Sequence, residues 1–235
     1  MLYSFISEEF RSLLALAGII FAFGVTAAAT AKLQGVLPKD HGREFAYDGE
    51  KSAGKPRGAG IIFVLAFAGT AFLFAPMDAE RIIYLILIVI CMMTGYLDDA
   101  SEKSWGELRK GFLDLCVAAL TAMTFLKYNP NTIELAFFRV QLALPVWLYA
   151  VLIVILVWVS VNVTNCSDGV DGLSGTLTII SIMTIYAVDR VLEKGGDFSY
   201  LILLFAMCIL AYLWFNAAPS KLMMGDAGSR AMGLF

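Results

Sequence analysis

Charged residues are scarce in this chain of 235 residues: 16% are Asp, Glu, Lys or Arg, whereas 60% are hydrophobic. Soluble domains are about a quarter charged and about half apolar. The shortage of charge argues against a soluble globular protein, and the excess of apolar residues argues against a disordered one. The net charge of −3 gives no reason to expect nucleic acid as a partner.

Histidine and cysteine are also rare. His41 is the only histidine, and the four cysteines are scattered without a C-x-x-C pair. Because a Cys/His zinc site needs several such ligands at short spacing, the sequence argues against one. So few cysteines in a chain of this length also argue against a disulfide framework.

Long apolar runs take up most of the chain. A membrane-spanning helix needs roughly 20 mostly apolar residues. Seven runs approach this length, which is more than one soluble helical core can cover. We therefore expect an all-α, polytopic integral membrane protein with at least seven transmembrane helices, in a single domain over residues 1–235. The predicted spans are Leu13–Ala31, Gly58–Ala75, Ile82–Leu97, Phe112–Leu126, Leu144–Val161, Leu173–Val188 and Tyr200–Phe215.

Lysine and arginine are distributed unevenly between the polar segments that separate these runs. Eleven of the 17 fall in the segments after the first, third, fifth and seventh runs, which lie on one side of a membrane by alternation. Because cytoplasmic loops are enriched in Lys and Arg, this side is predicted to be cytoplasmic. The N-terminus is then expected outside.

Two adjacent carboxylates, Asp98 and Asp99, directly follow the third predicted span. Adjacent carboxylates repel each other unless a cation or a proton lies between them. A solvated helix end is the alternative, although the C-terminal end of a helix disfavours negative charge. The pair is therefore a candidate functional site.

The densest polar segment runs from Asn162 to Leu173 and interleaves amide and carboxylate side chains with glycines. Such oxygen ligands suit Mg²⁺, and glycine allows turns that bring the backbone close to a ligand. An Asn/Asp/Gly turn between two spans is the alternative, but it accounts for only one or two such residues. The four candidate side chains are Asn162, Asn165, Asp168 and Asp171.

Two further segments lie on the same predicted side. Asp226 stands between glycines ahead of a further apolar segment, although a flexible loop is an alternative there. The segment Lys51–Gly60 is basic and glycine-rich, which suits either phosphate binding or contact with anionic lipid. Together with the two acidic segments, these residues are predicted to converge around a diphosphate and Mg²⁺, since carboxylates brought together without a cation are costly.

The order of these motifs resembles a known family. Asp98-Asp99 comes first, then N-x-x-N-x-x-D-G-x-D-G-L from Asn162 to Leu173, then F-N-x-x-P…M-G-D-x-G-S from Phe215 to Ser229. This order is similar to that of the polyprenyl-phosphate N-acetylhexosamine-1-phosphate transferases. The resemblance implies about ten transmembrane helices and a late histidine-rich cytoplasmic motif. We therefore expect this chain to be truncated at its C-terminus.

Within the family, the residues resemble most the bacterial branch that uses phospho-N-acetylmuramoyl-pentapeptide. Ser167 before Asp168 and the run Met224–Asp226 are similar to that branch. The stretch Pro56-Arg57-Gly58 is closer to the N-acetylglucosamine-1-phosphate transferases, which leaves a UDP-GlcNAc donor as the alternative.

The first branch implies transfer from UDP-MurNAc-pentapeptide to undecaprenyl phosphate, with release of UMP, in peptidoglycan synthesis. It implies a bacterial inner (plasma) membrane, a cytoplasmic active site and Mg²⁺ as cofactor. A homodimer remains open as a further partner.

The resemblance also implies roles for particular residues. Asp226 is expected to be the primary Mg²⁺ ligand, with Asn165 nearby. Asp98 is expected to deprotonate or position the lipid phosphate, with support from Asp99. Asp98, Asp99 and Asp226 are thus the expected catalytic residues. The expected nucleotide or substrate contacts are Asn162, Asn165, Asp168, Asp171, Lys51 and Lys103.

The chain departs from the family at several of these places. Glu102 stands where the family has a lysine, and Lys103 follows it. Met223 replaces an aromatic residue that stacks on uracil, and Lys51 is displaced from the family's first-loop lysine. The lysine assignments therefore rest on neighbouring rather than matching positions.

A membrane transporter is the alternative of a different class, because carboxylates inside spans can form an ion path. Only Asp114 lies clearly within a predicted span, and it could also face the active site or the bundle. The clustering of polar residues on one side favours an enzyme. A structural scaffold is a third possibility, but it leaves the segment from Asn162 to Leu173 unexplained.

Overall fold

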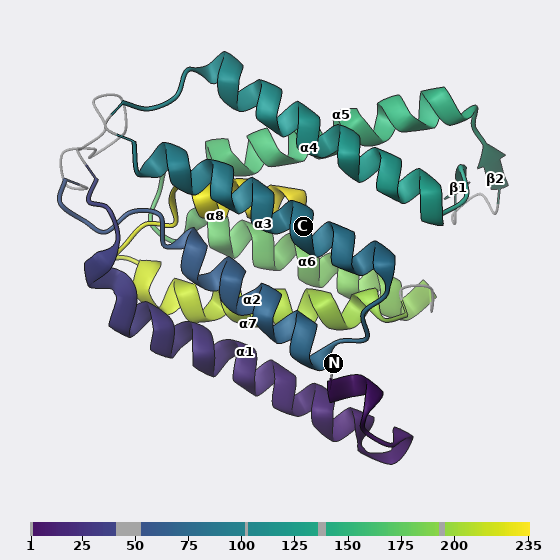
Figure 1. Ribbon diagram of the computed structural model, residues 1–235, viewed down its shortest axis with the longest axis horizontal. Helices are drawn as coiled ribbons and strands as arrows, with labels where there is room; N and C mark the ends of the chain where they lie inside the picture. The colour runs from purple at the N-terminus through teal and green to yellow at the C-terminus, as the bar shows by residue number, and fades with distance from the viewer. Residues whose placement is uncertain (1, 41–52, 102, 136–139, 193–195) are drawn as a thin grey trace.

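The computed structural model describes residues 2–40, 53–101, 103–135, 140–192 and 196–235. Within this part of the chain, eight α-helices form an elongated bundle in which most helices lie roughly along a common direction (Figure 1). The helices are α1 Arg11–Leu33, α2 Gly60–Phe74, α3 Ala79–Asp99, α4 Glu107–Tyr128, α5 Val146–Ser167, α6 Leu173–Leu192, α7 Phe198–Asn216 and α8 Gly225–Leu234.

Six of these helices (α1, α3, α4, α5, α6 and α7) are long and apolar enough to cross a membrane. The chain is thus a polytopic membrane protein by the length and composition of its helices. The structure differs from the prediction of seven spans at the second one, Gly58–Ala75, where α2 has only 15 residues. At 1.5 Å per residue such a helix is roughly 22 Å long, short of a hydrocarbon core of about 30 Å.

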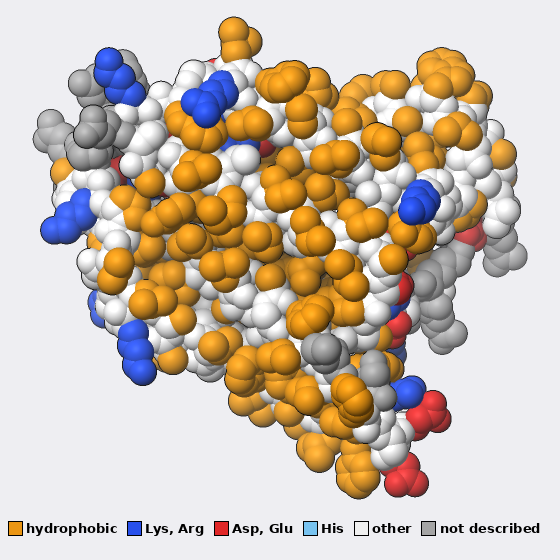
Figure 2. Space-filling view, viewed as in Figure 1, with side chains coloured by type: hydrophobic (Ala, Val, Ile, Leu, Met, Phe, Trp, Pro, Cys, Tyr) orange, Lys and Arg blue, Asp and Glu red, His pale blue; other side chains and the backbone are white. Residues whose placement is uncertain are grey.

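The outer surface of the bundle is apolar. Hydrophobic side chains cover most of the face seen in Figure 2, and charged side chains lie mainly toward its margins. In α5 only Val161 is buried, although residues 146–159 of this helix are all apolar. Exposed leucine, valine and tryptophan side chains on such a helix fit a surface that meets lipid rather than water.

The dense polar segment begins inside a helix and not in a loop, which differs from the prediction. The run ending at Val161 continues as helix to Ser167, so Asn162 and Asn165 lie in the last turns of α5. The turn itself covers Asp168–Gly172, and Gly172 has a φ of 77°. The all-α prediction also omitted a short antiparallel hairpin between α4 and α5, formed by β1 Thr132–Leu135 and β2 Val140–Ala143.

The core is formed mainly by α2, α7 and α8. Phe63 and Phe67 of α2 pack against Phe205 of α7, and Phe63 also packs against Tyr212. The short α8 lies between α3 and α5, against both of which it packs closely. Its second residue is Asp226, so the position of that carboxylate follows the position of α8.

Candidate active site

Backbone hydrogen bonds join the first loop to the segment that precedes α8. The Ala59 and Gly60 amides donate to the Met223 and Met224 carbonyls, both at 3.0 Å, and Met223 N donates to Pro56 O at 2.8 Å. This short ladder brings residues 56–60 beside residues 223–226, which lie more than 160 positions later in the chain. It places the side chain of Arg57 next to the start of α8.

Arg57 pairs with three carboxylates from different segments. Its Nε lies 2.9 Å from Asp99 Oδ1, its Nη2 lies 3.6 Å from Asp226 Oδ1, and its Nη1 lies 3.4 Å from Asp40 Oδ1. The side chains of Asp99 and Asp40 are almost wholly buried. One guanidinium therefore links the first loop, the end of α3 and the start of α8.

Lys110 provides the second cation of this cluster from the first turns of α4. Its Nζ lies 2.7 Å from Asp98 Oδ2 and 3.1 Å from Asp226 Oδ2. Asp98 also accepts a hydrogen bond of 2.5 Å from the Trp105 amide. The adjacent carboxylates Asp98 and Asp99 thus point to different cations, which relieves the repulsion expected of an acidic pair.

The carboxylate of Asp99 caps the N-terminus of α8. Its two oxygens accept hydrogen bonds of 3.1 Å from the amides of Asp226 and Ala227. These amides belong to the first turn, where a helix leaves N–H groups without intrahelical partners and favours negative charge. Gly225 permits the approach, because its φ is 67° and a Cβ there would lie 2.2 Å from Asp99 Oδ2.

The charges of this cluster do not balance. Four carboxylates (Asp40, Asp98, Asp99 and Asp226) are joined by ion pairs to two cations (Arg57 and Lys110), a formal surplus of two negative charges. No three acidic, histidine or cysteine side chains of the described residues lie together closely enough to hold a metal ion as they stand. Mg²⁺ commonly uses only one or two carboxylates, with waters and substrate phosphates completing its shell. The surplus charge and the oxygen donors fit such an ion.

The ion pairs keep the central groups charged. Burial raises the pKa of Asp226, but the ammonium of Lys110, followed by Asn165 and Arg57, outweighs burial and holds the pKa below its usual value. Burial likewise lowers the pKa of Arg57, and the surrounding carboxylates, Asp99 foremost, more than reverse this effect. Asp226 is therefore an ionised oxygen donor at neutral pH.

The other predicted site residues lie around this cluster. Asn165 donates to Ser229 Oγ of α8 at 2.9 Å, whereas Asn162 donates to the carbonyl of Trp158 within its own helix. Asp171 pairs with Lys55 at 3.7 Å and accepts from the Ser220 amide at 3.3 Å.

Asp168 is half-buried at the end of α5 and has polar contacts of its own. The Lys103 side chain is exposed, and its carbonyl accepts from Ser101. Lys51 lies outside the described residues.

Sequence reasoning missed Lys110, Asp40 and the individual role of Arg57 within the basic loop. A signal for Lys110 was present: it precedes Asp114 by four residues at the start of an apolar helix. Residues at this spacing share one face of a helix. Two ionisable residues on one face of such a helix indicate a polar partner on the neighbouring element.

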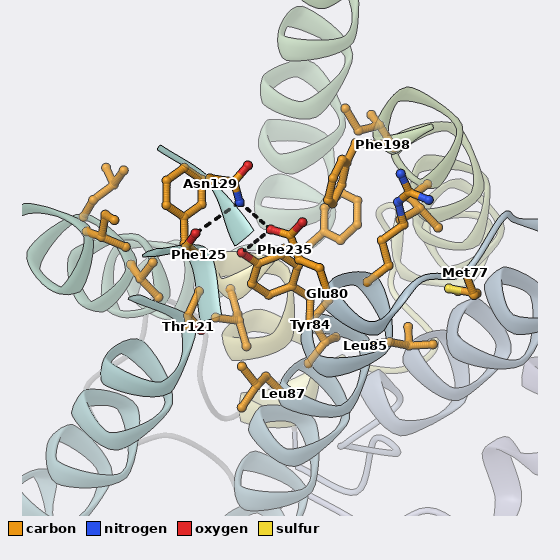
Figure 3. A pocket seen from close by; sticks show the side chains of 18 of the residues that line it. Met77, Glu80, Tyr84, Leu85, Leu87, Thr121, Phe125, Asn129, Phe198 and Phe235 are labelled. Atoms are coloured by element: carbon orange, nitrogen blue, oxygen red, sulfur yellow. Dashed lines mark hydrogen bonds between the residues drawn. The ribbon is translucent and has the colours of Figure 1, made fainter. Parts of the chain in front are cut away.

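An apolar cavity lies away from this cluster. It has a volume of about 720 Å³ and is lined by α3, α4, α5, α7 and the end of α8. Among the residues that line it, Glu80 accepts hydrogen bonds from Tyr84 and Asn129 (Figure 3). Its lining includes none of the predicted site residues, so it does not help to place them.

Comparison with known proteins places this geometry in context. Residues 81–235 match the family described as Glycosyl transferase family 4. The chain is 36% identical over 237 residues to the phospho-N-acetylmuramoyl-pentapeptide-transferase of Treponema pallidum (strain Nichols), covering 93% of this chain and 64% of that protein.

Proteins of the same name from other bacteria are also similar. The one from Thermotoga neapolitana is 31% identical over 186 residues, which is 77% of this chain and 58% of that protein. The one from Carboxydothermus hydrogenoformans is 30% identical over 204 residues, covering 78% of this chain and 60% of the relative. The chain thus spans about three fifths of the length of these relatives.

Proposed function

We propose, because this chain belongs to glycosyl transferase family 4, that it transfers phospho-N-acetylmuramoyl-pentapeptide from its UDP carrier to undecaprenyl phosphate and releases UMP. The observation that carries this proposal is the convergence of Asp98, Asp99 and Asp226 with the cations Arg57 and Lys110. These residues come from four separate segments of the chain. The names of the relatives favour the muramoyl donor over UDP-GlcNAc.

The cluster has the chemistry that phosphoryl transfer requires. Two cations beside carboxylates can bind the diphosphate of a nucleotide-sugar, and catalysis of such reactions is largely positioning and charge stabilisation. Asp98, held between Lys110 and the Trp105 amide, is placed to orient or deprotonate the phosphate of the acceptor lipid. Asp99 supports the site by fixing both Arg57 and the start of α8.

Mg²⁺ is part of this proposal. Asp226 would be its first ligand, with Asn165 beside it. Asp226 lies at the start of α8, and Asn165 contacts the same helix. When bound, Mg²⁺ would neutralise charge on the diphosphate while the bond to UMP breaks. Asp168, Asp171 and Asn162 line the adjoining end of α5 and the turn after it, and we assign them to the nucleotide.

The proposal also includes an orientation and a location. The segments that carry the cluster are those predicted to be cytoplasmic from their lysine and arginine content. The donor would then reach the site from the cytoplasm, and undecaprenyl phosphate would enter from the inner leaflet. The expected location is the plasma (inner) membrane of a bacterium, with the chain crossing it several times.

The test is a comparison of donors. The purified protein in detergent would receive undecaprenyl phosphate and Mg²⁺ with either UDP-MurNAc-pentapeptide or UDP-GlcNAc, and UMP release would be measured. We expect turnover with the first donor only. Turnover only with UDP-GlcNAc would overturn the choice of donor, and no UMP from either would overturn the proposed reaction.

Lys110 and Lys103 provide a matched pair of lysine variants. Lys110 pairs with two carboxylates of the cluster, whereas the side chain of Lys103 is exposed. We expect Lys110→Met to reduce kcat/KM for UMP release by about a hundredfold or more, the scale of one electrostatic contact to the transition state. Lys103→Met should change it less than about threefold, an exposed charge contributing little. Equal losses in both variants would contradict the structural assignment.

A further inference from the structure

Asp114, the one carboxylate well inside a predicted span, forms a buried ion pair with Arg230 of α8. Arg230 Nε donates to Asp114 Oδ1 at 3.0 Å, and Nη2 contacts the same oxygen. Arg230 is 2% exposed and Asp114 is 4% exposed. Because a lone charge within a membrane-spanning helix is costly, each residue depends on the other.

This pair and the Lys110–Asp226 pair have the same spacing on both helices. Asp114 follows Lys110 by four residues on α4, and Arg230 follows Asp226 by four residues on α8. Residues four apart stand one above the other on a helix face. The two ion pairs are therefore adjacent steps of one ladder between helices that run in the same direction.

The two ion pairs carry their charges in opposite order. On α4 the cation Lys110 comes first and the anion Asp114 second, whereas on α8 the anion Asp226 comes first and the cation Arg230 second. A slip of α8 by one turn, roughly 5.4 Å, would place like charges opposite each other. Asp226 would face Asp114, or Arg230 would face Lys110. Only one register satisfies both steps.

We infer that the Asp114–Arg230 pair is a positioning element that fixes the register of α8 and thereby places Asp226 for metal binding. The inference rests on the proposed function only in taking Asp226 as the metal ligand. Asp114 and Arg230 form the buried ion pair, and we assign them no contact with substrate. Their effect on chemistry passes through the position of Asp226.

A second observation supports the need for an ion pair that fixes the register of α8. The helix α8 has ten residues, and its N-cap residue Met224 makes no side-chain capping bond. Asp99 accepts hydrogen bonds from the first amides of α8, and glycines pack closely against the side of the helix. Apolar contacts between helix faces specify the axial register only weakly. Buried polar pairs are the best-attested way of specifying register.

The test replaces the pair by apolar residues of similar shape, Asp114→Leu with Arg230→Met. A neutral, packed pair can be as stable as a buried ion pair, whereas a single substitution leaves an unpaired charge. The affinity for Mn²⁺, used as the probe for the metal site, would be measured by electron paramagnetic resonance on the full protein in detergent. Thermal unfolding would be followed in parallel.

We expect the double variant to unfold within a few degrees of the original protein but to bind Mn²⁺ at least tenfold more weakly. Unchanged Mn²⁺ affinity in the folded double variant would overturn the inference. If that variant does not fold, Arg230→Gln, which retains a donor to Asp114, decides in the same way: tenfold weaker Mn²⁺ binding supports the inference and unchanged binding overturns it.

Two controls separate this inference from the proposed function. Arg81→Met with Asp197→Asn removes an ion pair of 3.2 Å outside the cluster and should leave Mn²⁺ affinity unchanged. Asp226→Asn should abolish Mn²⁺ binding. If the original protein binds no Mn²⁺, or if Asp226→Asn binds it as well, the metal site itself is wrong and both proposals are overturned. Weaker Mn²⁺ binding in the Asp114 and Arg230 variants and in Asp226→Asn, with unchanged binding in the Arg81 and Asp197 control, supports both the metal site and the positioning role.

Discussion

Asp226→Asn is expected to reduce Mg²⁺-dependent UMP release on the order of a thousandfold, the scale of removing a group that stabilises transition-state charge. The carboxylate is the point at which both cations of the cluster meet, since Arg57 and Lys110 each pair with it. Asparagine preserves the shape of the side chain and one acceptor oxygen for Lys110, but it removes the charge that would bind a divalent cation.

The fold should survive this substitution. Asp226 contributes its backbone to the start of α8, and the amide that donates to Asp99 is unchanged in the variant. Circular dichroism and thermal unfolding in detergent would verify an intact bundle. Full activity in a folded Asp226→Asn protein would contradict the assignment of Asp226 as the metal ligand.

Gly95→Ala and Gly60→Ala are expected to destabilise the bundle by about 1–3 kcal/mol each, as overpacking does. A Cβ on Gly95 of α3 would lie 2.4 Å from the carbonyl of Asp226, and one on Gly60 of α2 would lie 2.0 Å from the amide of Gly228. Since both obstacles are backbone atoms of α8, relief requires that α8 move. Activity should fall with stability, because Asp226 moves with the helix.

Gly69→Ala is the matched control for these two variants. It lies in the same helix as Gly60, and a Cβ there would meet nothing within 4 Å. We expect unfolding temperature and UMP release close to those of the original protein, since alanine is a better helix former. Equal destabilisation by Gly60→Ala and Gly69→Ala would show that close packing against α8 is not the cause.

Topology and motifs predicted which segments of the chain would come together. Alternation of the seven apolar runs predicts that the segments after runs one, three, five and seven share one side, and the structure joins residues from these segments. Arg57 pairs with Asp99, and Lys55 pairs with Asp171. Six of the seven predicted runs became helices long enough to span a membrane.

The pairing of individual side chains could not be predicted in this way. Lys110 and Asp226 are 116 residues apart, and nothing local to either shows that they meet. The contact depends on the axial position of α8, which packs against α3 and α5 through close glycine contacts. The prediction for Lys103 rests on its place next to a position where the family has a lysine, yet the chain turns after Asp99 and leaves the Lys103 side chain exposed.

The end of α5 shows a second limit of the sequence pattern. Asn162 and Asn165 were assigned to a polar loop because apolar character ends at Val161, but the helix continues to Ser167. Helical hydrogen bonds need no apolar side chains, so composition marks where the apolar span ends and not where the helix ends. Placing Asn165 on a helix allows it to reach Ser229 of α8.

The lipid product shows whether the protein carries out the proposed transfer. The protein would be incubated with UDP-MurNAc-pentapeptide and undecaprenyl phosphate, with Mg²⁺ or with a chelator, and the lipid fraction would be examined by mass spectrometry. We expect undecaprenyl-diphosphate-linked MurNAc-pentapeptide in the presence of Mg²⁺, none with the chelator, and only about a thousandth as much from Asp98→Asn or Asp226→Asn. Lipid-linked product that forms equally in these variants, or with the chelator present, would contradict this expectation.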